Sequence, residues 1–243
     1  MTKLGFIGAG NMARALAVGL GEPALFSDGG SGRAAALAEE LRGEAVPARE
    51  IAERADVVVL AHKPAQLQLV AGDLRGAKVV LSLLGGVAIE QVEASIEGAK
   101  VTRAMPNTAV AVRQGVTCVC GAEGLDELLE RVGIVVRLPE RLIDAATAVS
   151  GVAPAYVSLI AEAWIDAAVG QGIPAAQAAE LVSGALAGSA ALLESRGMDT
   201  LAVRREVTSP GGMTARGLRV LERSGLRSAF GDAAAAVVGT SGK

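Results

Sequence analysis

The stretch Lys3-Leu4-Gly5-Phe6-Ile7-Gly8-Ala9-Gly10-Asn11-Met12-Ala13-Arg14-Ala15-Leu16 opens the chain and decides its fold. A short apolar run leads into two glycines with G-x-G spacing, and a helical pattern rich in Ala and Leu follows. This order predicts a strand, a tight turn and a helix N-terminus. Gly8 would form the turn, Gly10 would let the backbone approach a pyrophosphate, and Ala13 would let the helix pack closely on the strand. The motif predicts a dinucleotide site, although a glycine-rich turn can also serve packing alone.

The composition argues against several classes of protein. Of the 243 residues, 51% are hydrophobic but only 2% are aromatic, so the core must be built from Ala, Val and Leu. A net charge of −3 gives no basic footprint for nucleic acid or for an anionic membrane surface. Cys118 and Cys120 form neither a disulfide framework nor a zinc set, so we expect two core residues in a reducing cytoplasm and no metal site.

Two stretches could suggest a membrane or export segment. Asn11 and Arg14 interrupt the apolar run near the N-terminus, which argues against a signal peptide. Residues 145–161 form the longest uncharged stretch, and they fall short of the ~20 residues that span a bilayer. We therefore expect a soluble, cytoplasmic protein.

Strand patterns alternate with helical patterns over the first part of the chain. Residues 56–61 form a continuous β-branched run of the kind found in buried parallel strands. The other predicted strands are residues 24–27, 79–82, 101–105, 116–120 and 134–138. This alternation predicts an α/β fold with a doubly wound sheet, in which ligands bind at the C-terminal ends of the strands.

The segment after the second predicted strand gives two opposite indications about the cofactor. Asp28 follows Gly10 at close to the spacing of about 20 residues at which a carboxylate meets the adenosine ribose of NAD. Arg33, together with Ser27 and Ser31, could instead hold the 2′-phosphate of NADP. Asp28 could also be a simple turn residue, and Ser31 could cap a helix over residues 31–42. We favour NADPH, with NADH as the alternative cofactor.

The composition changes near residue 145, where strand patterns give way to helical ones. We expect a dinucleotide-binding domain over residues 1–149 and a helical domain over residues 150–243. Helices are predicted at residues 156–169, 175–193, 214–224 and 227–238. The first two carry little charge around their circumference and must be buried. A domain of this size cannot cover them, so we expect self-association; a membrane location fails on length and on the few charges present.

The second informative stretch lies between these helices: Glu206-Val207-Thr208-Ser209-Pro210-Gly211-Gly212-Met213-Thr214. Pro-Gly-Gly cannot continue a helix, whereas residues 215–222 form a good one. A glycine-rich turn that presents the N–H groups of a helix start is a site for a carboxylate. Thr214 supplies a hydroxyl at the mouth of this turn, or it serves only as the N-cap of the helix.

These stretches resemble the pyrroline-5-carboxylate reductase family from Gly5 to about Phe230. The motifs that carry the resemblance are Gly5-Phe6-Ile7-Gly8-Ala9-Gly10-Asn11-Met12, Lys63-Pro64, Arg103-Ala104-Met105-Pro106-Asn107-Thr108, Pro154-Ala155-Tyr156-Val157 and Val207-Thr208-Ser209-Pro210-Gly211-Gly212. The last is the most specific. Departures from the family pattern occur at Ala109, where Pro is frequent, at Ala48, where Asn is frequent, and in the spacing between Ser150 and Tyr156.

The resemblance implies a Rossmann-type N-terminal domain and a C-terminal helical domain that interlocks with a second subunit. It also implies dimers that can assemble into decamers. The implied reaction is the reduction of 1-pyrroline-5-carboxylate to L-proline by hydride transfer from NAD(P)H, the last step of proline biosynthesis. The alternatives are a related Rossmann reductase that acts on another imine or a hydroxy acid, and a dinucleotide-binding sensor without chemistry.

The residue patterns and the resemblance together give a candidate site. The N–H groups around residues 209–213 would hold the substrate carboxylate, and the catalytic residue Thr214 would hydrogen-bond the ring nitrogen and relay its proton. His62 is expected to flank the cofactor rather than to act as the acid. The predicted substrate-binding residues are Val207, Ser209, Gly211, Gly212, Met213 and Thr214. The predicted cofactor-binding residues are Ile7, Gly8, Ala9, Gly10, Asn11, Met12, Ser27, Asp28, Arg33, Ala61, His62, Lys63, Pro64, Ser82 and Asn107.

Overall fold

The computed structural model describes residues 2–238 of the chain. The chain divides into two compact units. The first contains the described residues up to Pro154 together with the last two described residues, and the second runs from Ala155 to Ala236.

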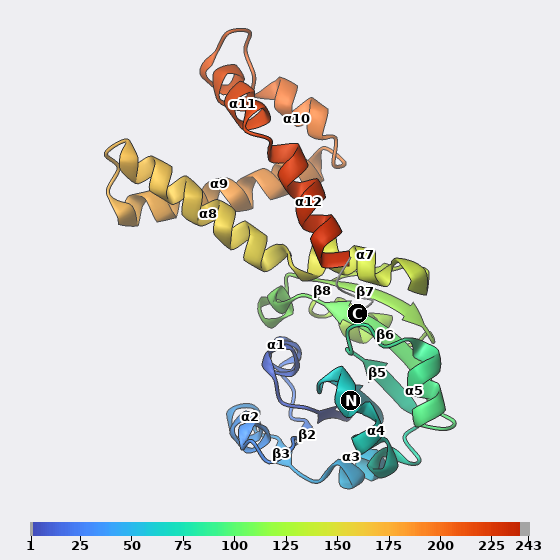
Figure 1. The fold of residues 1–243 in the computed structure, drawn as a ribbon. Helices are drawn as coiled ribbons and strands as arrows, with labels where there is room; N and C mark the ends of the chain where they lie inside the picture. Colours follow the sequence, from blue (N-terminus) through green and yellow to red (C-terminus); the bar gives the residue numbers. More distant parts are fainter. Residues whose placement is uncertain (1, 239–243) are drawn as a thin grey trace. The chain divides into compact units, whose positions relative to one another are not determined.

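The first unit is built on an eight-stranded sheet with the strand order β3-β2-β1-β4-β5-β6-β7-β8 (Figure 1). The strands are β1 Leu4–Ile7, β2 Leu25–Ser27, β3 Glu44–Ala45, β4 Val57–Leu60, β5 Val79–Ser82, β6 Lys100–Pro106, β7 Gly115–Gly121 and β8 Gly133–Arg137. The order reverses direction between β1 and β4, which are neighbours in the sheet although two strands separate them in sequence. The α/β sheet predicted from the alternating patterns is confirmed.

Two features of the sheet were not anticipated from the sequence. The short strand β3 extends the edge beyond β2. Strands β6 and β7 pair antiparallel, whereas every other neighbouring pair is parallel. The cause is the connection between them, which contains only the 3₁₀ turn Thr108–Val112. A parallel crossover needs about a dozen residues or more, so this link can only return the chain antiparallel.

Helices of the first unit cover both faces of the sheet. They are α1 Asn11–Leu20, α2 Arg33–Leu41, α3 Ala48–Arg54, α4 Leu67–Ala71, α5 Ile89–Ser95, α6 Asp126–Glu130 and α7 Ile143–Ala146. One apolar cluster joins the sheet to α1, α2 and α6, and a second joins it to α3, α4 and α5. Alternate residues of β4 enter the two clusters, Val57 and Val59 the first and Val58 and Leu60 the second, as a strand buried on both faces requires.

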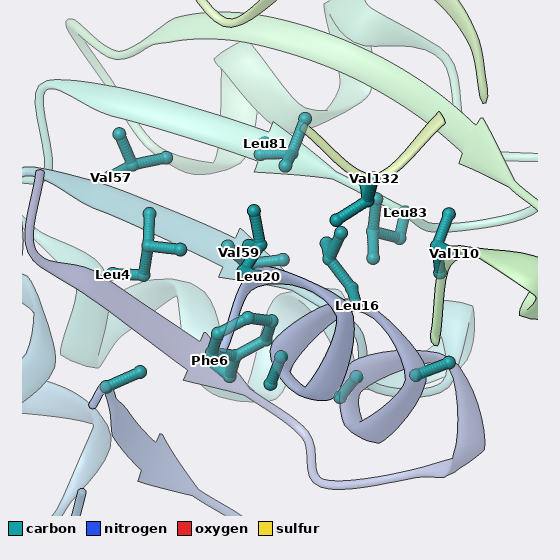
Figure 2. Close-up of a cluster of buried hydrophobic side chains, with 14 of the residues drawn as sticks. Leu4, Phe6, Leu16, Leu20, Val57, Val59, Leu81, Leu83, Val110 and Val132 are labelled. Carbon is teal, nitrogen blue, oxygen red and sulfur yellow. The ribbon is translucent and has the colours of Figure 1, made fainter. Parts of the chain in front are cut away.

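The first cluster fixes α1 on the sheet. Figure 2 shows Leu16 and Leu20 of α1 among the side chains of this cluster, which also includes Phe6 of β1 and Val59 of β4. Phe6 also stacks on Phe26, with ring centroids 5.3 Å apart. The cluster otherwise consists mainly of aliphatic side chains, in line with the low aromatic content. Cys118 and Cys120 are buried free thiols in β7 that pack with Ile143, as expected from the sequence.

The second unit is helical. Its helices are α8 Ala153–Gly170, α9 Ala175–Ser195, α10 Thr200–Glu206, α11 Met213–Arg223 and α12 Leu226–Val238. The four predicted helices are present, whereas α10 was missed because it is short and carries no clear apolar stripe. Its start is fixed by Asp199, whose carboxylate accepts hydrogen bonds from the backbone N–H groups of Leu201 and Ala202.

The long helices of this unit expose apolar side chains. Along α8 and α9, only Ala178 and Val182 are buried, while Leu159, Trp164 and Leu181 are 65%, 48% and 60% exposed. The helical segments Glu140–Gly170 and Ala175–Ser195 are long and apolar enough to cross a membrane by length and composition alone. The length argument made from the sequence against a membrane segment is therefore wrong. Whether a membrane or another protein surrounds these helices, their exposed apolar side chains must be shielded from water by something outside the chain.

A close approach between α1 and the β6–β7 connection gives a stability prediction. A Cβ on Gly19 would lie 2.0 Å from the carbonyl oxygen of Val110, and the Gly19 carbonyl accepts a hydrogen bond of 2.8 Å from Arg113 Nε. We expect Gly19→Ala to lower the free energy of unfolding by about 1–3 kcal/mol, because backbone must move to make room. Urea denaturation followed by circular dichroism measures this change.

Gly72→Ala is the matched control. Gly72 lies in a 3₁₀ turn with φ −60°, and a Cβ there would meet nothing within 4 Å. The Gly72→Ala substitution should leave the free energy of unfolding unchanged or raise it slightly. Equal stability of the two variants would contradict the proposed tight packing at Gly19.

Candidate functional site

The glycine turn after β1 has the form that its sequence predicts. Gly8 adopts φ +103°, and its N–H donates a 2.8 Å hydrogen bond to the Ser27 carbonyl of β2. A Cβ on Gly8 would lie 2.6 Å from the backbone atoms of Ala61 and His62, so only glycine fits. Gly10, the N-cap of α1, is surrounded by open space, because a Cβ there would meet no atom within 4 Å. The turn therefore leaves room above the first N–H groups of α1.

A pocket of about 960 Å³ opens over this turn, at the edge of the sheet where β1, β2 and β4 end. Its volume is in the range of small-molecule and cofactor sites. Residues predicted to bind the cofactor make up most of its lining: Ile7, Gly8, Ala9, Gly10, Asn11, Met12, Ser27, Asp28, Arg33, Ala61, His62, Lys63 and Pro64. The structure thus brings together residues from four separate segments of the chain.

Two of the predicted cofactor residues, Ser82 and Asn107, do not line this pocket. Ser82 is fully buried at the end of β5. Asn107 is also buried; its Nδ2 donates to the Ser150 carbonyl at 3.0 Å, and its Oδ1 accepts from the N–H of Val116 at 3.3 Å. Asn107 therefore ties the turn after β6 to the segment that precedes α8.

Other lining residues were not predicted. They are Gly29, Pro47, Gln66, Val70, Asp73, Leu83 and Gly85. Ser31, predicted to help Arg33 hold the 2′-phosphate, and Ala48, at a position where the family often has Asn, also line the pocket. The rule that ligands bind at strand ends indicated Ser82, but Leu83 and Gly85, just beyond it, are the residues that line the pocket. Pro47 and Ala48 follow the short strand β3, which the sequence did not reveal.

Asp28 organises the loop between β2 and α2. Its Oδ1 accepts from the N–H of Gly30 at 2.9 Å, and its Oδ2 accepts from the Ser31 hydroxyl at 2.7 Å and from the N–H of Ala34 at 2.9 Å. These hydrogen bonds, that from Ala34 foremost, lower the pKa of Asp28. The prediction that Ser31 caps the helix is wrong: α2 begins after Gly32, and Asp28 satisfies one of its free N–H groups.

His62 lies at the pocket wall with one ring nitrogen engaged. Its Nδ1 is 2.8 Å from the Lys63 carbonyl oxygen, which can only accept, so Nδ1 carries the proton. Its Nε2 is buried and has no hydrogen-bond partner among the described residues. Burial lowers the pKa of His62. A neutral ring with its proton held by a backbone carbonyl is poorly suited to act as an acid.

The Ser-Pro-Gly-Gly loop of the second unit joins α10 to α11. Gly211 adopts φ +69°, and the N–H of Gly212 donates to the Ser209 carbonyl at 3.0 Å. A Cβ on Gly212 would lie 2.3 Å from Ser209 Oγ and 3.1 Å from the Ser209 carbonyl oxygen, so a larger residue here would force the Ser209 side chain to move. Gly212 is the N-cap of α11. Thr214 is the second residue of the helix, so the alternative that it serves as the N-cap is wrong.

The start of α11 presents donors. The first N–H groups of a helix have no partner within it, and here they belong to Met213, Thr214 and the residue after them. Among the residues that the structure describes, no side chain caps this end. The loop therefore offers backbone N–H groups beside the hydroxyls of Ser209 and Thr214, which is a suitable arrangement for a carboxylate. Thr208 also has a buried Oγ1 without a hydrogen-bond partner among the described residues.

A glycine turn at the carboxyl edge of a parallel sheet, with a pocket where the strand order reverses, defines a Rossmann-type dinucleotide-binding oxidoreductase. Comparison with known proteins specifies it further. Residues 3–86 match the family model described as NADP oxidoreductase coenzyme F420-dependent, and residues 140–243 match that of pyrroline-5-carboxylate reductase dimerisation. The chain belongs to the pyrroline-5-carboxylate reductase family.

Individual relatives agree with this assignment. The pyrroline-5-carboxylate reductase of Mycobacterium tuberculosis is 34% identical to this chain over an alignment of 271 positions, gaps included. The alignment covers 94% of this chain and 92% of the relative. The crystal structure of the Streptococcus pyogenes enzyme has a TM-score of 0.90 at 28% identity, covering 99% of this chain and 98% of that one. The Plasmodium falciparum enzyme, solved with NADP bound, has a TM-score of 0.86 at 27% identity, covering 99% and 97%.

Substitution of the two glycines of the turn, Gly8 and Gly10, should have different effects. Gly10→Ala should fold normally, since its φ of −80° suits any residue, but its methyl group would enter the pocket. We expect a cost of about 1–3 kcal/mol in dinucleotide binding, which is roughly a 5- to 150-fold increase in Kd. Gly8→Ala should lose thermal stability as well, because it strains a positive φ against the backbone of Ala61.

Titration calorimetry with NADP⁺ and thermal denaturation of the same samples separate the two effects. Full dinucleotide affinity in Gly10→Ala would show that the ligand does not approach this part of the turn.

Proposed function

We propose that this chain reduces 1-pyrroline-5-carboxylate to L-proline with NADPH, and that NADH is a weaker alternative. The observation that carries the proposal is a glycine-turn pocket in a chain whose whole length follows the pyrroline-5-carboxylate reductases. We further propose that residues 1–149 bind the dinucleotide and that residues 150–243 bind the substrate and associate. The unit division at Pro154 and the two family models support these limits.

The pocket fits a dinucleotide on its own features. Open space at Gly10 and the uncapped N-terminus of α1 suit a pyrophosphate. Arg33 lines the pocket, and no ion pair is formed by it among the described residues, so it is available for a phosphate. When bound, the reduced nicotinamide supplies the hydride. The Plasmodium falciparum relative with NADP bound supports the choice of NADPH.

In this proposal, the loop before α11 binds the substrate. The N–H groups of Met213 and Thr214, with the Ser209 hydroxyl, would hold the carboxylate of the cyclic imine. Val207, Gly211 and Gly212 would shape the loop around it. The Thr214 hydroxyl would hydrogen-bond the ring nitrogen and hand on its proton, since a hydroxyl both donates and accepts. His62, with Nδ1 turned to a carbonyl, would only flank the cofactor.

The activity itself is the direct test. Purified protein should oxidise NADPH when 1-pyrroline-5-carboxylate is supplied, and the product should be L-proline. A panel of other cyclic imines and 2-hydroxy acids, each with NADPH and NADH, checks the alternative reductases. Tight NADPH binding without turnover on any substrate would favour a sensor and contradict the proposal.

Thr214→Ala tests the proposed catalytic hydroxyl. We expect kcat/KM to fall by roughly 10²-fold, the scale of a lost proton-transfer partner. NADPH binding should be unchanged, because Thr214 lies on a different unit from the glycine-turn pocket. Thr214→Ser, which keeps the hydroxyl, should retain most of the activity. Equal activity of the Ala and Ser variants would remove the hydroxyl from the mechanism.

We propose that the apolar helices α8 and α9 are covered by a second copy of the chain. The match of residues 140–243 to a dimerisation model supports protein rather than lipid as the cover. Dimers would be the basic assembly, and the dimers would associate further into decamers. Burial of two free thiols without a disulfide is in keeping with a cytoplasmic location.

Leu181→Glu tests this assembly. Leu181 is 60% exposed in the isolated chain. A charged side chain at this position would therefore be unfavourable only if another subunit covers it. We expect the variant to shift towards monomers in analytical ultracentrifugation, because a buried unpaired charge is strongly unfavourable. Gln171→Glu is the control: it adds the same charge in the exposed turn after α8, and it should not shift the protein towards monomers. A wild-type chain that sediments as a monomer would contradict the proposal.

A further inference from the structure

The Asp28 carboxylate is in a position from which an acid commonly accepts hydrogen bonds from the adenosine ribose of NAD. In this chain most of its acceptor capacity is already used. An ionised carboxylate offers about four acceptor positions, and the Gly30 N–H, the Ser31 hydroxyl and the Ala34 N–H occupy three. Oδ2 takes two of these donors. Two neighbouring ribose hydroxyls cannot both be accepted without breaking the loop's own hydrogen bonds.

Those hydrogen bonds fix the path of the chain into α2. Gly30 and Gly32 adopt φ +89° and +78°, and Gly32, the N-cap residue, has no side chain with which to cap the helix. Asp28 supplies the missing cap from six residues away through the Ala34 N–H. Arg33, between Gly32 and Ala34, is thereby held at the pocket rim as the first residue of α2.

The guanidinium of Arg33 is free to meet a ligand. Arg33 lines the large pocket and also a smaller adjoining one of about 190 Å³, to which Arg14 contributes. Arg14 is paired with Glu40, with Nε and Oε2 3.1 Å apart. Within the described part of the chain, no carboxylate lies within ion-pair distance of Arg33. Of the two arginines, Arg33 is the one that an incoming phosphate would find unpaired.

We propose that Asp28 is a positioning residue for NADPH: it holds the loop that presents Arg33 to the 2′-phosphate and does not serve as the ribose acceptor that selects NAD. Its negative charge is balanced locally by three donors and by the positive end of α2, which limits its repulsion of a phosphate. The inference rests on the proposed function only in taking the ligand to be a nicotinamide dinucleotide.

The test uses two ligands that differ only in the 2′-phosphate, adenosine 2′,5′-bisphosphate and adenosine 5′-monophosphate. Titration calorimetry of the full chain measures both without turnover. In Asp28→Ala we expect affinity for the bisphosphate to fall about tenfold, on the scale of one charge-assisted hydrogen bond, with that for the monophosphate unchanged. A ribose acceptor predicts the opposite: a weaker monophosphate and a tighter bisphosphate. That result, or an equal loss of both, would overturn the proposal.

A double-mutant cycle tests whether Asp28 acts through Arg33. Arg33→Ala should itself lower bisphosphate affinity, and adding Asp28→Ala should then lower it little further, since the two residues act as a unit. Additive losses would overturn the proposal. Asp28→Ser, which keeps an acceptor for the loop, should restore part of the bisphosphate preference and covers the case that Asp28→Ala folds poorly. Failure of this restoration in a folded Ser variant would count against the positioning role.

Glu39→Gln is the matched control. Glu39 is an exposed carboxylate on the same helix and lines neither pocket, so its charge can be removed without effect on either ligand. The result is also separate from the proposed reaction: a chain that prefers the bisphosphate but reduces no pyrroline carboxylate would keep this inference and reject the function.

Discussion

The first unit depends on the contact between the Gly8 turn and the backbone at Ala61 and His62. Strands β1 and β4 are neighbours in the sheet, and the segments that follow them, residues 8–12 and 61–64, both line the pocket. A side chain at Gly8 would force the strands apart at this point. The Gly8 N–H bond to Ser27 adds β2 to the same contact. One residue without a Cβ therefore sets the spacing of three strand ends around the cofactor site.

The sequence was a good guide where the signal is local. The G-x-G turn, the β-branched strand at residues 57–60 and the long apolar helices are each specified by a continuous segment. The sequence was a poor guide where a residue's role depends on its neighbours in space. Ser31 was interpreted as a helix cap, but its hydroxyl donates to the Asp28 carboxylate instead, and left-handed glycines stand on either side of it.

The misses at the pocket have the same origin. Leu83 and Gly85 lie one and three residues beyond the polar residue that the strand-end rule indicated, and only the three-dimensional structure shows that they line the pocket whereas Ser82 does not. Pro47 follows a two-residue strand that has too few residues to show a pattern. The antiparallel β7 was not foreseen because its own sequence is that of any buried strand; the short link before it determines its direction.

The scarcity of aromatic residues has a practical consequence for spectroscopy. Trp164 and Tyr156 are the chain's single Trp and single Tyr, and both lie on α8. Trp164 is about half exposed, so its emission responds to whatever covers that helix. The glycine-turn pocket contains neither residue. Intrinsic fluorescence is thus a label-free reporter of the proposed subunit association, because the chain's single Trp lies on a helix that a second copy would cover.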